Sequence, residues 1–213
     1  MQLLIDFILH IDQHIINLVN YFGDWTYLLL FLVIFIETGI VIMPFLPGDS
    51  LLFAAAAISA NPKYHLSIFI FIILFLIASI VGDSLNFFLG EKVGNKLTKQ
   101  KHIGKFIKQE QLDKAKTFFD KYGILAIFIA RFMPIIRTFA PFIAASSGYK
   151  YSKFVKYNVA ACIVWVLLCC GGGYFFGNIP FVQEHFSVVV LGIILVTCIP
   201  ALVALFKKEK KAQ

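Results

Sequence analysis

The chain has 213 residues, of which 60% are hydrophobic, and its mean hydropathy is +0.84. Soluble globular domains contain roughly 45–50% apolar residues, so this composition excludes a soluble protein and predicts an integral membrane protein. The formal net charge of +7 is concentrated in two lysine-rich segments, which is a signal of membrane topology and not of nucleic-acid binding.

The first 22 residues have the pattern of an amphipathic helix. Polar residues such as Asp6, Gln13 and Asn17 occupy one face, and apolar residues recur at helical spacing on the other. The apolar stripe consists of Leu4, Phe7, Ile8, Ile11, Ile15, Leu18, Val19 and Phe22. Such a helix either packs on the helix bundle or lies at the interface, and whether residues 1–22 span or lie on the membrane stays open.

Residues 25–90 and 122–180 form two halves with the same layout. Each half contains an interrupted apolar run and then an uninterrupted one of roughly the length that crosses a bilayer. The interrupted runs are 27–60 and 124–147, and the uninterrupted spans are 64–81 and 159–174. We expect Gly82-Asp83 to end the first span. A further apolar run, 187–206, predicts a last transmembrane helix before the basic tail 207–213.

The lysines predict the topology. The segment 91–121 holds nine lysines and four acidic residues, and three more lysines lie between residues 150 and 156. Basic loops stay in the cytoplasm under the positive-inside rule. If both clusters are cytoplasmic, residues 124–147 must leave and return on one side, which predicts a re-entrant hairpin. The last span then returns the chain to a cytoplasmic tail.

The repeated layout predicts the fold class. Because one transmembrane span separates the two interrupted runs, the first hairpin would enter from the opposite face. We therefore expect an all-α integral membrane protein in a single domain, 1–213. Its core is an inverted repeat of re-entrant hairpin plus transmembrane helix, with an N-terminal amphipathic helix and a C-terminal transmembrane helix.

Four charges interrupt the apolar runs: Glu37 and Asp49 in the first, and Arg131 and Arg137 in the second. A charge at membrane depth costs about 2.5–3.5 kcal/mol on insertion scales, so it usually marks a pathway or a substrate site. If the two hairpin tips meet, the four charges sum to zero and can satisfy one another. A purely structural clasp is the alternative interpretation.

Helix-breaking residues accompany these charges. Prolines at membrane depth are tolerated where the freed backbone faces protein or a water-filled cavity. The residues expected to break the hairpins are Pro44, Pro47, Gly48, Pro134 and Pro141. This coincidence favours a site over isolated charges at helix ends.

The four charges suggest a chemistry. Arginine side chains bind anions in bidentate geometry, most naturally a phosphate, so Arg131 and Arg137 are the expected substrate-binding residues. A phosphate that displaced Glu37 and Asp49 from the arginines would favour protonation of these acids. This makes the two acids candidates for proton coupling.

Other candidate sites are weaker. Asp83 is a secondary candidate, and solvation at a span end is its simplest explanation. His10 and His14 lie one helical turn apart but lack a third ligand, so we expect no metal and no cofactor. No nucleophile–base set or phosphate-binding loop occurs, so we do not expect an enzyme, and a lipid hydrolase is an improbable alternative.

Several long motifs resemble the DedA family, which belongs to the VTT (SNARE-associated) superfamily. The resemblance covers nearly the whole chain and is carried by Glu37-Thr-Gly, Pro44-Phe-Leu-Pro47-Gly48-Asp49, Gly82-Asp83, Arg131-Phe-x-Pro134-x-x-Arg137-Thr-Phe-x-Pro141, Phe154-x-x-x-Asn158…Trp165 and Gly173-Tyr-Phe-Phe-Gly177. It implies a bacterial inner-membrane protein with two opposed re-entrant hairpins. The family's functional acids and arginines correspond to Glu37, Asp49, Arg131 and Arg137.

The resemblance also implies a function. Family members are implicated in moving lipids between leaflets, notably undecaprenyl phosphate for envelope synthesis, with dependence on the proton motive force. We expect a lipid-phosphate transporter whose partners are its substrate, membrane lipids and protons, with homo-oligomerisation left open. The alternatives are a phospholipid flippase or scramblase, a proton-coupled small-solute or ion transporter involved in membrane homeostasis, and a structural membrane organiser.

Overall fold

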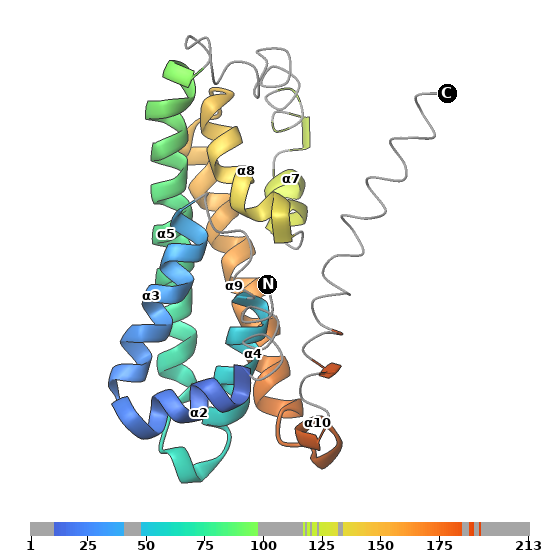
Figure 1. The fold of residues 1–213 in the computed structure, drawn as a ribbon. Helices are drawn as coiled ribbons and strands as arrows, with labels where there is room; N and C mark the ends of the chain where they lie inside the picture. Colours follow the sequence, from blue (N-terminus) through green and yellow to red (C-terminus); the bar gives the residue numbers. More distant parts are fainter. Residues whose placement is uncertain are drawn as a thin grey trace. The chain divides into compact units, whose positions relative to one another are not determined.

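The computed structural model describes residues 11–40, 48–97, 117, 119, 121–122, 124–131, 134–184, 188–189 and 192. Within these residues all regular structure is helical and there is no strand, as the pattern of apolar runs predicts (Figure 1). The chain divides into two compact units, which are described separately below. Unit 1 comprises Met1–Ile34, Phe45–Ala78 and Val164–Gln213, and unit 2 comprises Phe35–Pro44 and Ser79–Ile163.

Several expectations concern residues outside the described part of the chain. They are residues 1–10, Pro44, Pro47, residues 98–116 of the basic segment, most of the last predicted span and the tail 207–213. These expectations therefore remain predictions from the sequence.

Two helices, α5 (Ile68–Leu97) and α9 (Tyr151–Phe176), are long and apolar enough to cross a membrane. The expectation that Gly82-Asp83 ends the first span is wrong, because α5 continues through it for another 14 residues, to Leu97. Gly82 is used for close packing: a Cβ at this position would collide with the side chain of Thr38. A glycine that lets another helix approach gives the same local signal in the sequence as a glycine at the end of a span.

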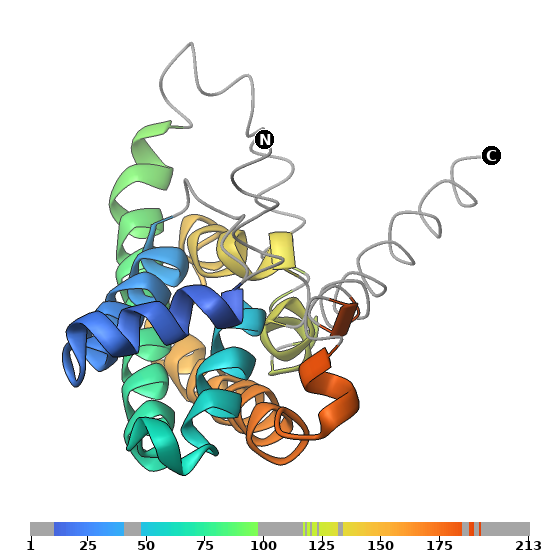
Figure 2. The same ribbon diagram turned by 60° about the horizontal axis from the view of Figure 1, so that its bottom comes forward.

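In unit 1 the amphipathic pattern of the N-terminal segment corresponds to helix α2 (Ile11–Phe22). Ile15 and Val19 are buried, whereas Asn17 is exposed. The helix packs against α4 (Gly48–Ser59) (Figure 2). It ends at Gly23, whose positive φ of 52° is the left-handed conformation that glycine adopts most readily after a helix.

Helix α4 is buried along its whole length, and small residues bring it close to the end of α9. A Cβ at Gly173 would collide with the backbone of Phe53, and one at Gly177 with Ala57. These two glycines are four residues apart, so they lie on one face of α9 as a G-x-x-x-G pattern. Such patterns let helix backbones approach closely in membranes, where van der Waals packing holds helices together.

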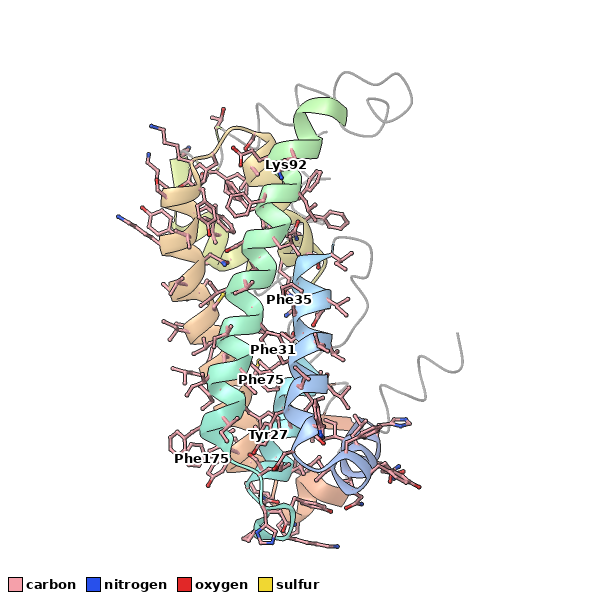
Figure 3. All side chains as sticks on the ribbon, turned by 90° about the vertical axis from the view of Figure 1, so that its left-hand side faces the viewer. Tyr27, Phe31, Phe35, Phe75, Lys92 and Phe175 are labelled. Carbon is pink, nitrogen blue, oxygen red and sulfur yellow. The ribbon has the colours of Figure 1, made fainter. Side chains whose placement is uncertain are left out.

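Helix α3 (Trp25–Gly39) runs beside α5 in the same direction (Figure 3). In unit 1 the Tyr27 hydroxyl accepts a hydrogen bond from the backbone N–H of Ser67 at 2.6 Å. In unit 2 the glycine at the end of α3, Gly39, lies against Gly82. Helix α4 and the short η1 (Pro62–Tyr64) lie between α3 and α5 in the sequence.

In unit 2, helices α7 (Ile124–Arg131) and α8 (Pro134–Ser146) pack against each other. The first half of α7 and the last turns of α8 share a core that contains Ile127 of α7 and Ala144 of α8. The two helices are therefore antiparallel. Phe87 of α5 and Phe154 of α9 contact each other in the same core, with ring centroids 4.7 Å apart and ring planes tilted by 30°. Gly148, with a φ of 80°, ends α8.

Helix α10 (Pro180–Glu184) follows α9 after a short turn. In that turn the amide of Asn178 donates a hydrogen bond to the carbonyl oxygen of Ala57 at 3.4 Å.

Candidate functional site

A buried ion pair joins Glu37 on the last turn of α3 to Arg137 near the start of α8. The guanidinium NH2 group of Arg137 donates to Oε1 of Glu37, and both side chains are at least nine-tenths buried. These residues are 100 positions apart in the sequence, and both belong to unit 2. The structure therefore brings together one acid and one arginine from the two interrupted runs.

Asn86 of α5 fixes the backbone on both sides of this pair. Its amide nitrogen donates to the carbonyl oxygen of Thr38 at 3.1 Å and to that of Thr138 at 2.7 Å. Thr38 and Thr138 directly follow Glu37 and Arg137, so one buried side chain holds both helices in register. No role for Asn86 follows from the expectations above, although a polar residue in an apolar helix is a usable signal.

A second buried ion pair joins Arg131, the last residue of α7, to Asp83 of α5. The guanidinium NH1 group donates to Oδ2 of Asp83 and lies 3.3 Å from Oδ1 of Asn158 on α9. Asp83 is only 3% exposed. Solvation at a span end, the explanation favoured from the sequence, is therefore wrong: Asp83 is inside α5 and its charge is balanced by an arginine.

Asp49 belongs to unit 1 and lies in the first turn of α4, which Gly48 begins. Its Oδ1 accepts a hydrogen bond from the indole Nε1 of Trp165 at 2.8 Å, and both side chains are buried. A carboxylate in the first turn of a helix also interacts favourably with the positive end of the helix dipole. The sequence alone does not pair Asp49 with Trp165.

The prolines of the second interrupted run take two different positions. Pro134 is the first residue of α8, where its missing N–H leaves no helical bond unmade. Pro141 lies inside α8 and cannot donate the usual helical hydrogen bond to the carbonyl of Arg137, four residues earlier. The helix backbone is thus altered at the residue that carries the charge.

The two arginines of unit 2 line one small space although they pair with different acids. This space measures about 10 Å³, close to the minimum of about 10–15 Å³ that one water molecule needs. Its polar lining comes from Asp83, Arg131, Arg137 and Asn158. In the described conformation this space is therefore too small for a phosphate.

The charges of these two pairs sum to zero. Removing one partner of a buried pair leaves an uncompensated charge, which typically costs about 3–5 kcal/mol. The arrangement is consistent with an anion site because an incoming anion can replace a carboxylate at an arginine without leaving that arginine unpaired.

The part of the chain that the structure describes contains no group of three or more His, Cys, Asp or Glu side chains that could hold a metal ion. His14 lies on α2, and His10 is outside the described residues.

Comparison with known proteins gives consistent matches. Residues 46–175 match the model of the VTT domain. Protein DedA of Escherichia coli (strain K12) is 44% identical over 209 residues, which are 98% of this chain and 95% of that protein. The uncharacterized membrane protein Rv0364 of Mycobacterium tuberculosis is 36% identical over 173 residues, or 81% of this chain and 75% of that protein.

The inner membrane protein YghB of Escherichia coli (strain K12) is 31% identical over 180 residues, which are 84% of this chain and 78% of that protein. No solved structure matches the chain.

Proposed function

Because this chain belongs to the DedA family of VTT-domain membrane proteins, we propose that it transports a lipid phosphate between the leaflets of a bacterial inner membrane. The best candidate for the substrate is undecaprenyl phosphate, so the protein would support envelope synthesis. The proposal involves no covalent step.

The observation that carries this proposal is the pair of buried arginines that line one space. Arg131 and Arg137 are each held by a carboxylate, from Asp83 and Glu37 respectively. A phosphate headgroup offers several acceptor oxygens to guanidinium groups. The lipid tail would stay in the hydrocarbon of the bilayer, so only the headgroup needs a polar site.

A short helix supports the re-entrant part of the proposal. A helix needs about 20 residues to cross the hydrocarbon core, but α3, which is described beyond both of its ends, has 15 residues. In unit 2, α8 runs along α5 in the same direction and α7 runs back against it. We propose that α3–α4 and α7–α8 are the two hairpins of an inverted repeat.

In the proposed mechanism, the headgroup exchanges with the carboxylates at the arginines. When a phosphate binds Arg137, Glu37 loses the cation that stabilises its negative charge in a buried position. Protonation of Glu37 would then relieve the cost of burying that charge. Asp49, in unit 1, is proposed as a second proton-coupling acid. Proton uptake would thereby accompany anion binding.

The lysines support a proposed orientation. Lys153 and Lys156 are exposed in the first turns of α9. Under the positive-inside rule we propose that they, the segment 91–121 and the C-terminus lie in the cytoplasm.

Transport in proteoliposomes tests the proposal. The purified full-length protein should move undecaprenyl phosphate between leaflets, and Arg137→Ala should abolish this movement. Lys153→Ala, which removes an exposed cation, is the matched control and should retain it. Phosphatidylglycerol as a second lipid distinguishes a general phospholipid scramblase from a lipid-phosphate transporter.

Arg137→Ala leaves Glu37 as a buried charge without a partner, which can by itself unfold the protein. A variant in which both residues are neutral separates this effect from the loss of transport. The double variant Glu37→Gln with Arg137→Gln removes both charges together. If this variant is folded and still transports undecaprenyl phosphate at the wild-type rate, the role of the arginine in headgroup binding is refuted.

A further inference from the structure

The hydrogen bonds around Arg131 fix the orientation of the Asn158 side chain. A guanidinium group can only donate, so the atom of Asn158 that lies 3.3 Å from Arg131 must be the amide oxygen, Oδ1. The amide nitrogen Nδ2, with its two N–H donors, is therefore directed away from this contact. The chemistry of arginine thus removes the usual ambiguity of an asparagine amide.

The Nδ2 group has no acceptor among the residues that the structure describes. Asn158 is nevertheless only 2% exposed. A buried donor without an acceptor is costly, since water cannot compensate for the lost hydrogen bond. The contact with Arg131 needs only an acceptor oxygen, so the unpaired Nδ2 calls for an explanation of its own.

Asn158 lines the same small space as Arg131 and Arg137. When both arginines are paired with carboxylates, this space is too small for a phosphate. Separation of the ion pairs would enlarge it beside three side chains that carry N–H donors. The unused donors of Asn158 are thus adjacent to the position at which an anion would meet the arginines.

We propose that Asn158 is a third substrate-binding residue, whose Nδ2 donates a hydrogen bond to an oxygen of a bound phosphate group. This inference rests on the proposed function and adds a specific, uncharged contact to it. The amide provides a directional hydrogen bond without adding a charge. It therefore favours a ligand that places an acceptor oxygen next to Nδ2 of Asn158. The same contact would serve a lipid headgroup or free phosphate.

The test measures binding to the full-length protein in detergent micelles. The probes are undecaprenyl phosphate, undecaprenol as the uncharged lipid, and inorganic phosphate as the soluble source. Asn158→Asp keeps an oxygen toward Arg131 but replaces the donor by an acceptor. We expect it to weaken the binding of undecaprenyl phosphate about 10- to 100-fold, the effect of losing a hydrogen bond to a charged group.

Asn178→Asp is the control, because it makes the same substitution at an exposed amide outside the space that the two arginines line. It should leave the affinity unchanged. Asn158→Ala is a second variant that adds no charge, and it should weaken binding about tenfold. Wild-type affinity in either folded Asn158 variant overturns the inference.

The probes separate this inference from the proposed function. If the wild-type protein does not prefer undecaprenyl phosphate to undecaprenol, the proposed function fails and the inference fails with it. If the preference exists and Arg137→Ala removes it while the Asn158 variants keep it, only the inference fails. If inorganic phosphate binds as tightly as the lipid and Asn158→Asp weakens both, the inference holds and free phosphate replaces the lipid as ligand.

Discussion

Trp165 of α9 donates a hydrogen bond from its indole Nε1 to Oδ1 of Asp49 at 2.8 Å, within unit 1. The bond joins the first turn of the buried helix α4 to a helix long enough to cross the membrane. An aromatic residue thus supplies a polar contact to a buried acid.

Trp165→Phe should destabilise the protein by about 1–3 kcal/mol, because it removes one donor from a buried carboxylate while keeping an aromatic ring. The change is measured as a lower midpoint of thermal unfolding in detergent. Trp25→Phe is the control, because Trp25 is 67% exposed. Equal shifts for the two variants would show that the bond to Asp49 contributes nothing.

Asp83→Ala should destabilise the protein by about 3–5 kcal/mol, because Arg131 would be left as a buried charge without its carboxylate. The double variant Asp83→Leu with Arg131→Met removes both charges and should recover most of this loss. Expression level and unfolding midpoint measure the effect. The double variant should still fail to transport. If it folds no better than Asp83→Ala, the ion pair does not account for the loss.

Asn86→Leu should destabilise the protein by about 2–4 kcal/mol, since two hydrogen bonds to the backbones of α3 and α8 are lost. The same measurement on Asn17→Leu, at an exposed position of α2, gives the control. A variant that is destabilised as little as Asn17→Leu would contradict the role given to Asn86.

Gly173→Ala should destabilise the protein by about 1–3 kcal/mol, because the added methyl group would collide with the backbone of Phe53. Gly171→Ala is a closely matched control on the same helix, with nothing within 4 Å of the added Cβ. That variant should be neutral or more stable by up to about 1 kcal/mol. Thermal unfolding of both compares them directly, and a smaller loss at position 173 than at 171 would rule out the close contact.

The sequence predicted the helical class, the amphipathic N-terminal helix and the two long apolar helices. These features depend on composition and periodicity, which are local properties. It also identified Glu37 and Arg137 as residues that could meet, because opposite charges in apolar runs need partners.

The partners of Arg131 and Asp49 could not be predicted in the same way. Asp83 follows a glycine, and the sequence does not show whether such a glycine ends a helix or lets another helix approach. Trp165 and Asn86 contact residues 116 and 48 or more positions away. Such pairings follow from how the helices cross, which local patterns do not specify.

Helix α5 carries both Asp83 and Asn86, three residues apart and therefore on one face of the helix. Asp83 forms the ion pair with Arg131. Asn86 donates hydrogen bonds to the backbone carbonyls of the residues that follow Glu37 and Arg137. A shift or turn of this one helix would disturb both attachments simultaneously. Arg131 would lose its carboxylate, and the helices that carry Glu37 and Arg137 would lose the side chain that holds them together, so α5 couples the two ion pairs.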